Sequence, residues 1–162
     1  MGVLGDASLP AFQDALKSQL EARPGLAGTA VVVGPPPPGI AQTLQWIAFL
    51  EVEGAERWTA MGRKQKEEKY WQKVYISVLT RDGDRDGAPG RNIAYALRKE
   101  IADQLLADPT VGASVWQAQV EKDNKFEPRL GITVQSADGG NTVDLAWREA
   151  ALFFDILVKN RI

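Results

Sequence analysis

The amino-acid sequence predicts an α+β fold, in which a mostly antiparallel sheet carries two main helices in a single domain over residues 1–162. Apolar residues recur every four positions, as on one face of a helix, at Ile93, Leu97, Ile101 and Leu105. Other segments alternate apolar and polar residues, which is the period of a strand. A chain of 162 residues buries about 70% of its unfolded surface, which is enough for one core.

The first predicted helix covers residues 9–22. Its apolar positions follow the helical period at Leu9, Phe12, Leu16 and Leu20. Ser8 is the expected N-cap, with Pro10 in the first turn, and the helix is expected to end before Arg23.

Two further segments predict strands near the N-terminus. The β-branched run 29–33 is typical of a strand covered on both faces, and the prolines from Pro35 end it rather than form a polyproline ligand. Residues 44–52 have side chains that would alternate between the two faces of a strand. A Glu53-Gly54 turn is expected to lead into a second strand at 57–61. This hairpin has two apolar faces, of which we expect a helix to cover the one bearing Ile47 and Phe49, in preference to a subunit contact.

The remaining strands flank the predicted helix that carries Ile93, Leu97, Ile101 and Leu105. The charged segment 62–69 is expected to be a solvated loop, with a protruding contact loop as the alternative. Tyr70, Val74, Ile76 and Val78 predict the core side of the next strand. Asp108-Pro109 ends the helix, and a strand at Trp116–Val120 is expected to pair with 130–134 across a loop containing Asn124 and Pro128. The last strand has its apolar face at Leu152, Phe154, Ile156 and Val158.

The composition excludes several kinds of chemistry. The chain has no His and no Cys, which excludes disulfides, thiolate nucleophiles, imidazole bases, and zinc or haem ligation by either residue. The formal charge of -2, from 19 basic and 21 acidic residues, predicts only passive contact with DNA. Five tryptophans could stack on bases, but Trp46, Trp58 and Trp116 occupy expected inward strand positions, which favours core packing.

No targeting or membrane segment is predicted. Asp6 interrupts the only candidate signal peptide, and Met1-Gly2 lacks the Ser or Thr at position 6 that myristoylation requires. The longest apolar stretch, 150–158, contains Asp155 and is far shorter than the roughly 20 residues of a membrane span. We therefore expect a soluble, cytoplasmic protein.

The segment 82–87 (DGDRDG) matches the first half of a calcium loop, with Asp82, Asp84 and Asp86 at alternate positions. The closing Glu of such a loop is absent, because Ile93 stands at the twelfth position. An acidic turn with Asp86 at a helix N-terminus is therefore the favoured interpretation. Two carboxylate pairs could do acid and base work only in a shared cleft: Glu51 with Glu53, and Glu67 with Glu68.

Several segments together resemble the tail terminator, or tail completion, proteins of long-tailed bacteriophages (siphophages). They are "LEARPGLAGTAVVVGPP" near the N-terminus, "KYWQKVYISVLT" in the middle, "ALRKEIADQLLADPTVGASV" after it and "FFDILVKNRI" at the end. The resemblance implies a non-enzymatic virion neck protein without a cofactor. Such a protein assembles as a ring, expected to be a hexamer, on the last ring of the tail-tube protein, stops tube polymerisation and meets the head-tail connector protein.

Mixed charges next to strand ends are the expected contact residues in such a ring, namely Arg63, Lys64, Lys66, Glu67, Glu68, Lys159 and Arg161. Two alternatives remain open. One is another ring protein of the same particle, in the tail tube or in head completion. The other is a calcium-dependent binding module or a carboxylate-based metal hydrolase that uses the aspartates of segment 82–87.

Overall fold

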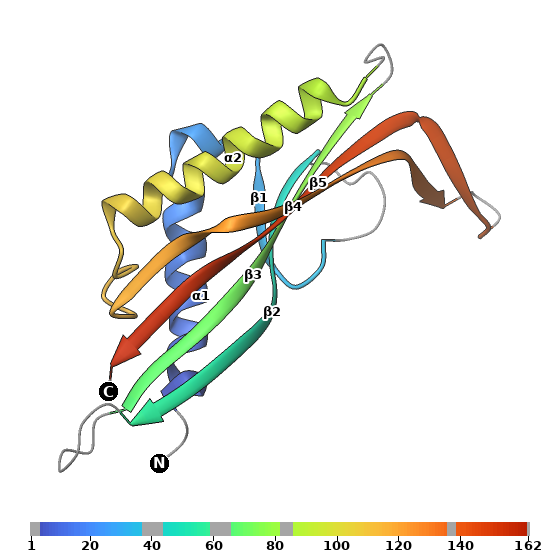
Figure 1. Ribbon diagram of the computed structural model, residues 1–162. Coiled ribbons are helices and arrows are strands. Elements are labelled where there is room, and N and C mark those ends of the chain that lie inside the picture. Colours follow the sequence, from blue (N-terminus) through green and yellow to red (C-terminus); the bar gives the residue numbers. More distant parts are fainter. Residues whose placement is uncertain (1–3, 37–43, 59–65, 82–85, 136–138, 162) are drawn as a thin grey trace.

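The computed structural model describes residues 4–36, 44–58, 66–81, 86–135 and 139–161 (Figure 1). Over these residues the chain forms, in order, α1 (Leu4–Glu21), the 3-10 turn η1 (Pro24–Leu26), β1 (Ala30–Val33), β2 (Gln45–Trp58), β3 (Lys66–Arg81), α2 (Ala88–Ala107), β4 (Gln117–Gln135) and β5 (Asn141–Arg161). The strands make one sheet in the order β1-β2-β3-β5-β4, in which only β1 and β2 are parallel. The predicted α+β fold with a mostly antiparallel sheet is confirmed.

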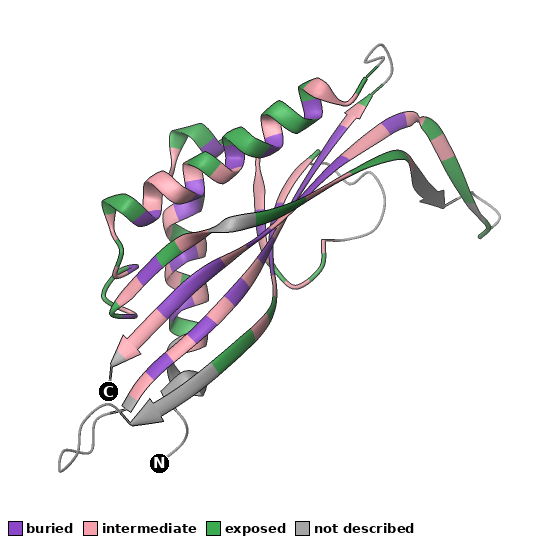
Figure 2. Cartoon of the chain, in the orientation of Figure 1, coloured by how far each residue is buried: buried purple, intermediate pink, exposed green. Residues whose placement is uncertain are grey.

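Both helices contribute to one core against a single face of the sheet, and Figure 2 shows buried residues alternating along the central strands. The predicted stripes are confirmed, with Phe12, Leu16 and Leu20 of α1 and Leu97, Ile101 and Leu105 of α2 buried. Ile47 and Phe49 are buried in this core, as expected. They meet the apolar rows of the two central strands, formed by Tyr70, Val74, Ile76 and Val78 in β3 and by Leu152, Phe154, Ile156 and Val158 in β5.

The N-terminal helix is longer than the sequence indicates. It begins at Leu4, so that Ser8 and Pro10 lie inside the helix and the predicted N-cap at Ser8 is wrong. Pro10 has no N–H, so the helix lacks one backbone hydrogen bond at this position. No helix in the described part of the chain is long and apolar enough to cross a membrane.

The strand β1 is not buried throughout its length, which corrects the prediction of a strand covered on both faces. It lies at the edge of the sheet, with Val31 buried but Val33 55% exposed. A continuous apolar run is therefore not sufficient evidence for a central strand, because edge position depends on which segments pair.

The predicted Glu53-Gly54 turn is wrong, because β2 continues through it to Trp58. Gly54 pairs with Tyr70 across the β2–β3 ladder, where a side chain at position 54 would crowd its partner. The expected loop over 62–69 is also partly wrong, since β3 begins at Lys66 and pairs with both β2 and β5. Residues 62–65 lie outside the described residues.

The predicted loop at Asn124 and Pro128 is likewise wrong, because β4 runs through both residues and pairs with β5 along its length. Two register shifts, between Val120 and Asn124 and between Leu130 and Ile132, absorb the irregularities. Pro128 is tolerated because β4 is the other edge of the sheet, where a missing N–H on the outer side breaks no ladder bond.

Candidate interaction surface

The sheet has a second face, opposite the core, which we call the open face because no described helix packs on it. The alternate residues of β3 and β5 that point to this face are paired across the ladder, as in Trp71 with Leu157, Tyr75 with Phe153, and Ser77 with Ala151. Trp71, Tyr75 and Ser77 occupy the positions between the predicted core residues of β3, and the register places them on the open face, as that prediction implies.

Aromatic side chains form the middle of the open face. The rings of Tyr75 and Phe153 are stacked, with centroids 4.8 Å apart and an interplanar angle of 14°. Both side chains are half-buried, while Ala48 beside Tyr75 and Ala151 beside Phe153 are buried. Near the start of β3, the ammonium of Lys69 lies 5.1 Å from the ring centroid of Trp71. The result is a partly exposed apolar strip across three strands.

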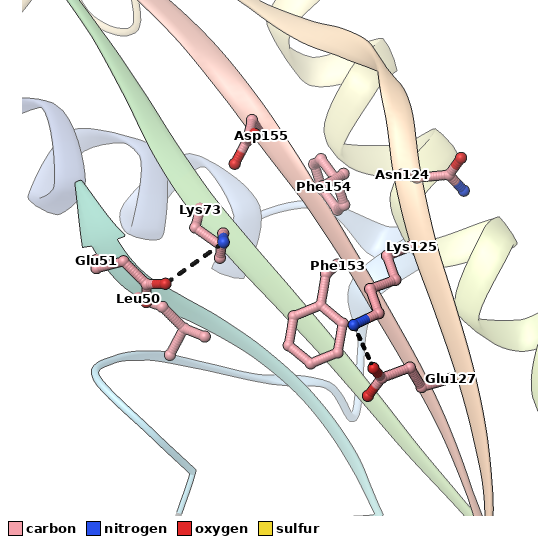
Figure 3. Close-up of a pocket in the computed structure, with 9 residues that line it drawn as sticks. All are labelled: Leu50, Glu51, Lys73, Asn124, Lys125, Glu127, Phe153, Phe154 and Asp155. Atoms are coloured by element: carbon pink, nitrogen blue, oxygen red, sulfur yellow. Dashed lines mark ion pairs between the residues drawn. The ribbon is translucent and has the colours of Figure 1, made fainter. Parts of the chain in front are cut away.

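Ion pairs flank this strip and line a groove of about 420 Å³ (Figure 3). On the β2 side, Lys73 Nζ lies 3.4 Å from Glu51 Oε1, and on the β4 side Lys125 Nζ lies 2.6 Å from Glu127 Oε1. Figure 3 shows Phe153 between the two pairs. Partial burial raises the pKa of the Asp155 carboxyl, which faces the same groove.

One carboxylate joins the aromatic strip to the charged border. Glu149 accepts hydrogen bonds from Tyr75 Oη at 3.0 Å, Ser77 Oγ at 2.9 Å and Arg129 Nη1 at 2.9 Å. Burial, with the negative Glu149 as a further cause, raises the pKa of Tyr75 to about 12. The phenol therefore stays neutral at ordinary pH and donates a hydrogen bond to Glu149, which fixes the orientation of the ring stacked on Phe153.

The structure separates the contact residues that the sequence proposed. Glu67 and Lys159 point to the open face, near one end of β3 and β5. Glu68 points the other way: it is 1% exposed, and its Oε1 accepts a hydrogen bond from Asn160 Nδ2 at 3.4 Å. The backbones of Lys66 and Arg161 pair within the sheet, at Trp58 and Glu67 respectively.

Four of the proposed positions lack a side-chain description. Arg63 and Lys64 lie outside the described residues, and the side chains of Lys66 and Arg161 are likewise not described. Glu68 is no longer a candidate for the exposed surface, because its carboxylate is buried on the core side. The open face therefore retains Glu67 and Lys159 from the set.

The acidic segment 82–87 is described only at its end. Asp82 and Asp84 lie outside the described residues, while Asp86 Oδ1 accepts a hydrogen bond from the N–H of Ala88 at 2.9 Å, at the start of α2. This is the helix-start position expected for Asp86. Among the residues that the structure describes, no group of three or more carboxylates is placed to hold a metal ion.

Sequence reasoning missed the aromatic strip because it assigned most tryptophans to the core. Trp116 is 45% exposed, and Trp46 is half-buried on the open face, so both inward assignments are wrong; the side chain of Trp58 is not described. The available signal was the opposite parity of Tyr75 and Phe153 to the core rows of their strands.

Comparison with known proteins assigns no family to this chain: neither a scan against models of known protein families nor a search of curated proteins finds a match.

Proposed function

We propose that this protein is a tail terminator of a long-tailed bacteriophage. In this role it assembles as a ring, a hexamer, on the last ring of the tail tube, ends tube polymerisation and joins the tail to the head-tail connector. It catalyses no reaction and needs no cofactor or membrane, and DNA passes through the ring passively. The protein is made in the host cytoplasm and works in the neck of the virion.

The observation that carries this proposal is the composition of the open face. A partly exposed strip of aromatic residues bordered by ion pairs is typical of a protein interface, which has an apolar centre and a polar rim. The side chains of Trp71, Tyr75 and Phe153 are only half-buried within one copy. A partner surface over them would remove the remaining apolar area from water, which favours association.

We propose that the open face meets the terminal ring of the tail tube. Mixed charge at the border suits a partner of mixed charge and gives orientation more than affinity. Glu67 and Lys159, which the resemblance already suggested as contacts, lie at one end of this face. The four resembling sequence segments supply the phage context, and the open face supplies the surface.

Electron microscopy of purified tail tubes without a cap tests the proposal. Addition of this protein should place a ring at one end of each tube and stop further growth when tube subunits are added. Trp71→Ser should weaken end binding by tenfold or more, on the order expected for a buried aromatic anchor. Tyr95→Ser is the matched control, because Tyr95 is an exposed aromatic residue on α2.

Two results would count against the role. Equal growth of tubes with and without the protein would contradict the terminator function. Trp71→Ser and Tyr95→Ser proteins that cap tubes equally well would remove the open face as the contact surface.

A further inference from the structure

The hairpin of β4 and β5 extends beyond the rest of the sheet and forms an arm, which we define as residues 130–135 and 141–146. The third strand of this region, β3, ends at Arg81, opposite Trp147, so the arm has only two strands. Figure 1 shows the ribbon turning away from the sheet here. The turn coincides with a register shift after Leu130 and with Gly131, which has a φ of +84°.

The arm carries apolar side chains in water. Leu130, Val143 and Leu145 are 57%, 63% and 66% exposed, respectively. A two-stranded hairpin is marginally stable by itself. Three exposed aliphatic side chains raise the free energy of this hairpin further as long as they remain in contact with water. The arm therefore has the composition of a segment that is completed by contact with another surface.

The chain offers an apolar groove of about 790 Å³ between the C-terminal half of α2 and the first part of β4. Leu105 and Ala118 are buried at its base, and Leu106, at 81% exposed, stands at its rim. Because β4 is an edge strand, its described pairing is with β5 alone, and the groove is continuous with that edge. The groove thus presents both apolar side chains and strand backbone.

The arm cannot reach the groove of its own chain. Both lie on β4, but the groove includes Val120 and the arm begins at Leu130, roughly 30 Å farther along at about 3.3 Å per residue. Figure 1 shows the arm and the C-terminal end of α2 at opposite ends of the molecule. An apolar projection at one end and an apolar groove at the other define a head-to-tail contact between copies, which generates a ring when its rotation closes.

We infer that the arm of one copy docks in the groove between α2 and β4 of a second copy. Each copy gives its arm to one neighbour and receives an arm from the other. This inference rests on the self-association in the proposed function and deepens it, because it names the subunit contact as distinct from the open face that meets the tube.

Cysteine cross-linking tests the contact cleanly, because the chain has no native cysteine. Val143→Cys protein is mixed with Leu106→Cys protein and oxidised, and a disulfide-linked heterodimer is expected, since docking would bring the two Cβ atoms within about 4.5 Å. The control mixes Val33→Cys with Leu106→Cys, because Val33 is comparably exposed, at 55%, on the opposite sheet edge. Equal yields from both mixtures, or none from the first, would overturn the inference.

A second variant tests whether the arm drives assembly. The double change Val143→Thr and Leu145→Gln keeps strand-forming capacity but removes apolar contact, so it should raise the dissociation constant of the assembly at least tenfold in sedimentation measurements. The same change should leave the melting temperature of the dilute monomer within a few degrees, because both side chains are mostly exposed.

The outcomes separate the two proposals. If the double variant assembles and caps tubes like the wild type, the arm contact is wrong while the terminator role stands. If the specific cross-link forms and the double variant fails to assemble, but the wild type never binds tube ends, the arm contact stands while the terminator role fails. A wild-type protein that stays monomeric at high concentration and at tube ends would contradict both proposals. The arm would then have to contact a different protein.

Discussion

Gly54 lies directly opposite Tyr70 in the β2–β3 ladder, so close that a Cβ at position 54 would stand 3.0 Å from the Cβ of Tyr70. Tyr70 has little room to move, because it is 4% exposed and its ring packs edge-on against Phe12 with centroids 6.2 Å apart. We therefore expect Gly54→Val to lower the free energy of unfolding by about 1 to 3 kcal/mol, as overpacking does. Urea denaturation of the two proteins measures the difference.

The control for this change is Glu53→Val, at an exposed position of the same strand. Valine favours strands and has space there, so its stability should stay within about 0.5 kcal/mol of the wild type. Equal effects at both positions would show that the approach of Gly54 to Tyr70 does not matter.

The packing of α2 predicts a large difference between two leucines of the same helix. Leu97 is 4% exposed and lies in the core, so Leu97→Ala should cost about 2 to 5 kcal/mol through loss of burial and the cavity left behind. Leu106 is 81% exposed, so Leu106→Ala in the dilute monomer should change stability by less than about 0.5 kcal/mol. Thermal unfolding of both variants decides the helix orientation. Melting temperatures within a degree of each other would contradict it.

Local patterns predicted the elements whose burial follows a regular period. The stripe of α2 and the core rows of β3 and β5 repeat every turn or every second residue, and their packing follows that repeat. Asp108 ends α2 at the predicted place, because the Asp-Pro dipeptide acts through local backbone restriction.

Elements that depend on distant partners were not predictable in this way. Gly54 and Pro128 both lie within strands, although each is a turn signal in isolation. Gly54 is required by the side chain of Tyr70, which lies in another strand, and Pro128 is tolerated because β4 is at a sheet edge. Neither fact is contained in the neighbouring residues of the chain.

The candidate surface was predictable only in part, for the same reason. Parity along β3 separates Tyr75 from the core row, but its stacking on Phe153 and its bond to Glu149 depend on the register of β3 with β5. The contact residues expected from charge alone divide between the two faces, since Glu67 and Glu68 are neighbours in a strand.

The turn after α2 predicts a loss of stability in acid. Asp108 accepts hydrogen bonds from the N–H of Gly112 at 2.7 Å and from Thr110 Oγ1 at 2.7 Å, and these bonds lower the pKa of its carboxyl to about 2. They hold a turn in which Val111, Gly112 and Ala113 have positive φ, a costly conformation for Val111. Because the folded pKa lies below the usual 3.8, the stabilisation is present above pH 4 and is lost as the pH falls toward 2.

Asp108→Asn should therefore lower the melting temperature at pH 7 and remove part of the decline between pH 4 and pH 2. Asp103→Asn is the control, because Asp103 pairs with Lys99 on the surface of α2 and such a pair contributes little. Parallel acid profiles for the wild type and Asp108→Asn would contradict the role of this carboxylate.

The open face predicts a complementary loss of stability in alkali, centred on Tyr75. Burial raises the pKa of its phenol from 10.0 to about 12, so the folded protein holds a proton that the unfolded chain releases earlier. The resulting stabilisation is complete below pH 10 and is lost as the pH rises toward 12. Tyr75→Phe removes this titration, so its stability should fall less steeply than that of the wild type over the same window. At pH 7 the Tyr75→Phe protein should be less stable by roughly 1 to 3 kcal/mol, because Glu149 loses a donor from a partly buried network.

An absorbance titration of tyrosinate, taken as the difference between wild type and Tyr75→Phe, locates the pKa of Tyr75 directly. A midpoint near 10 would show that the stacked phenol is not shielded from water as the structure requires.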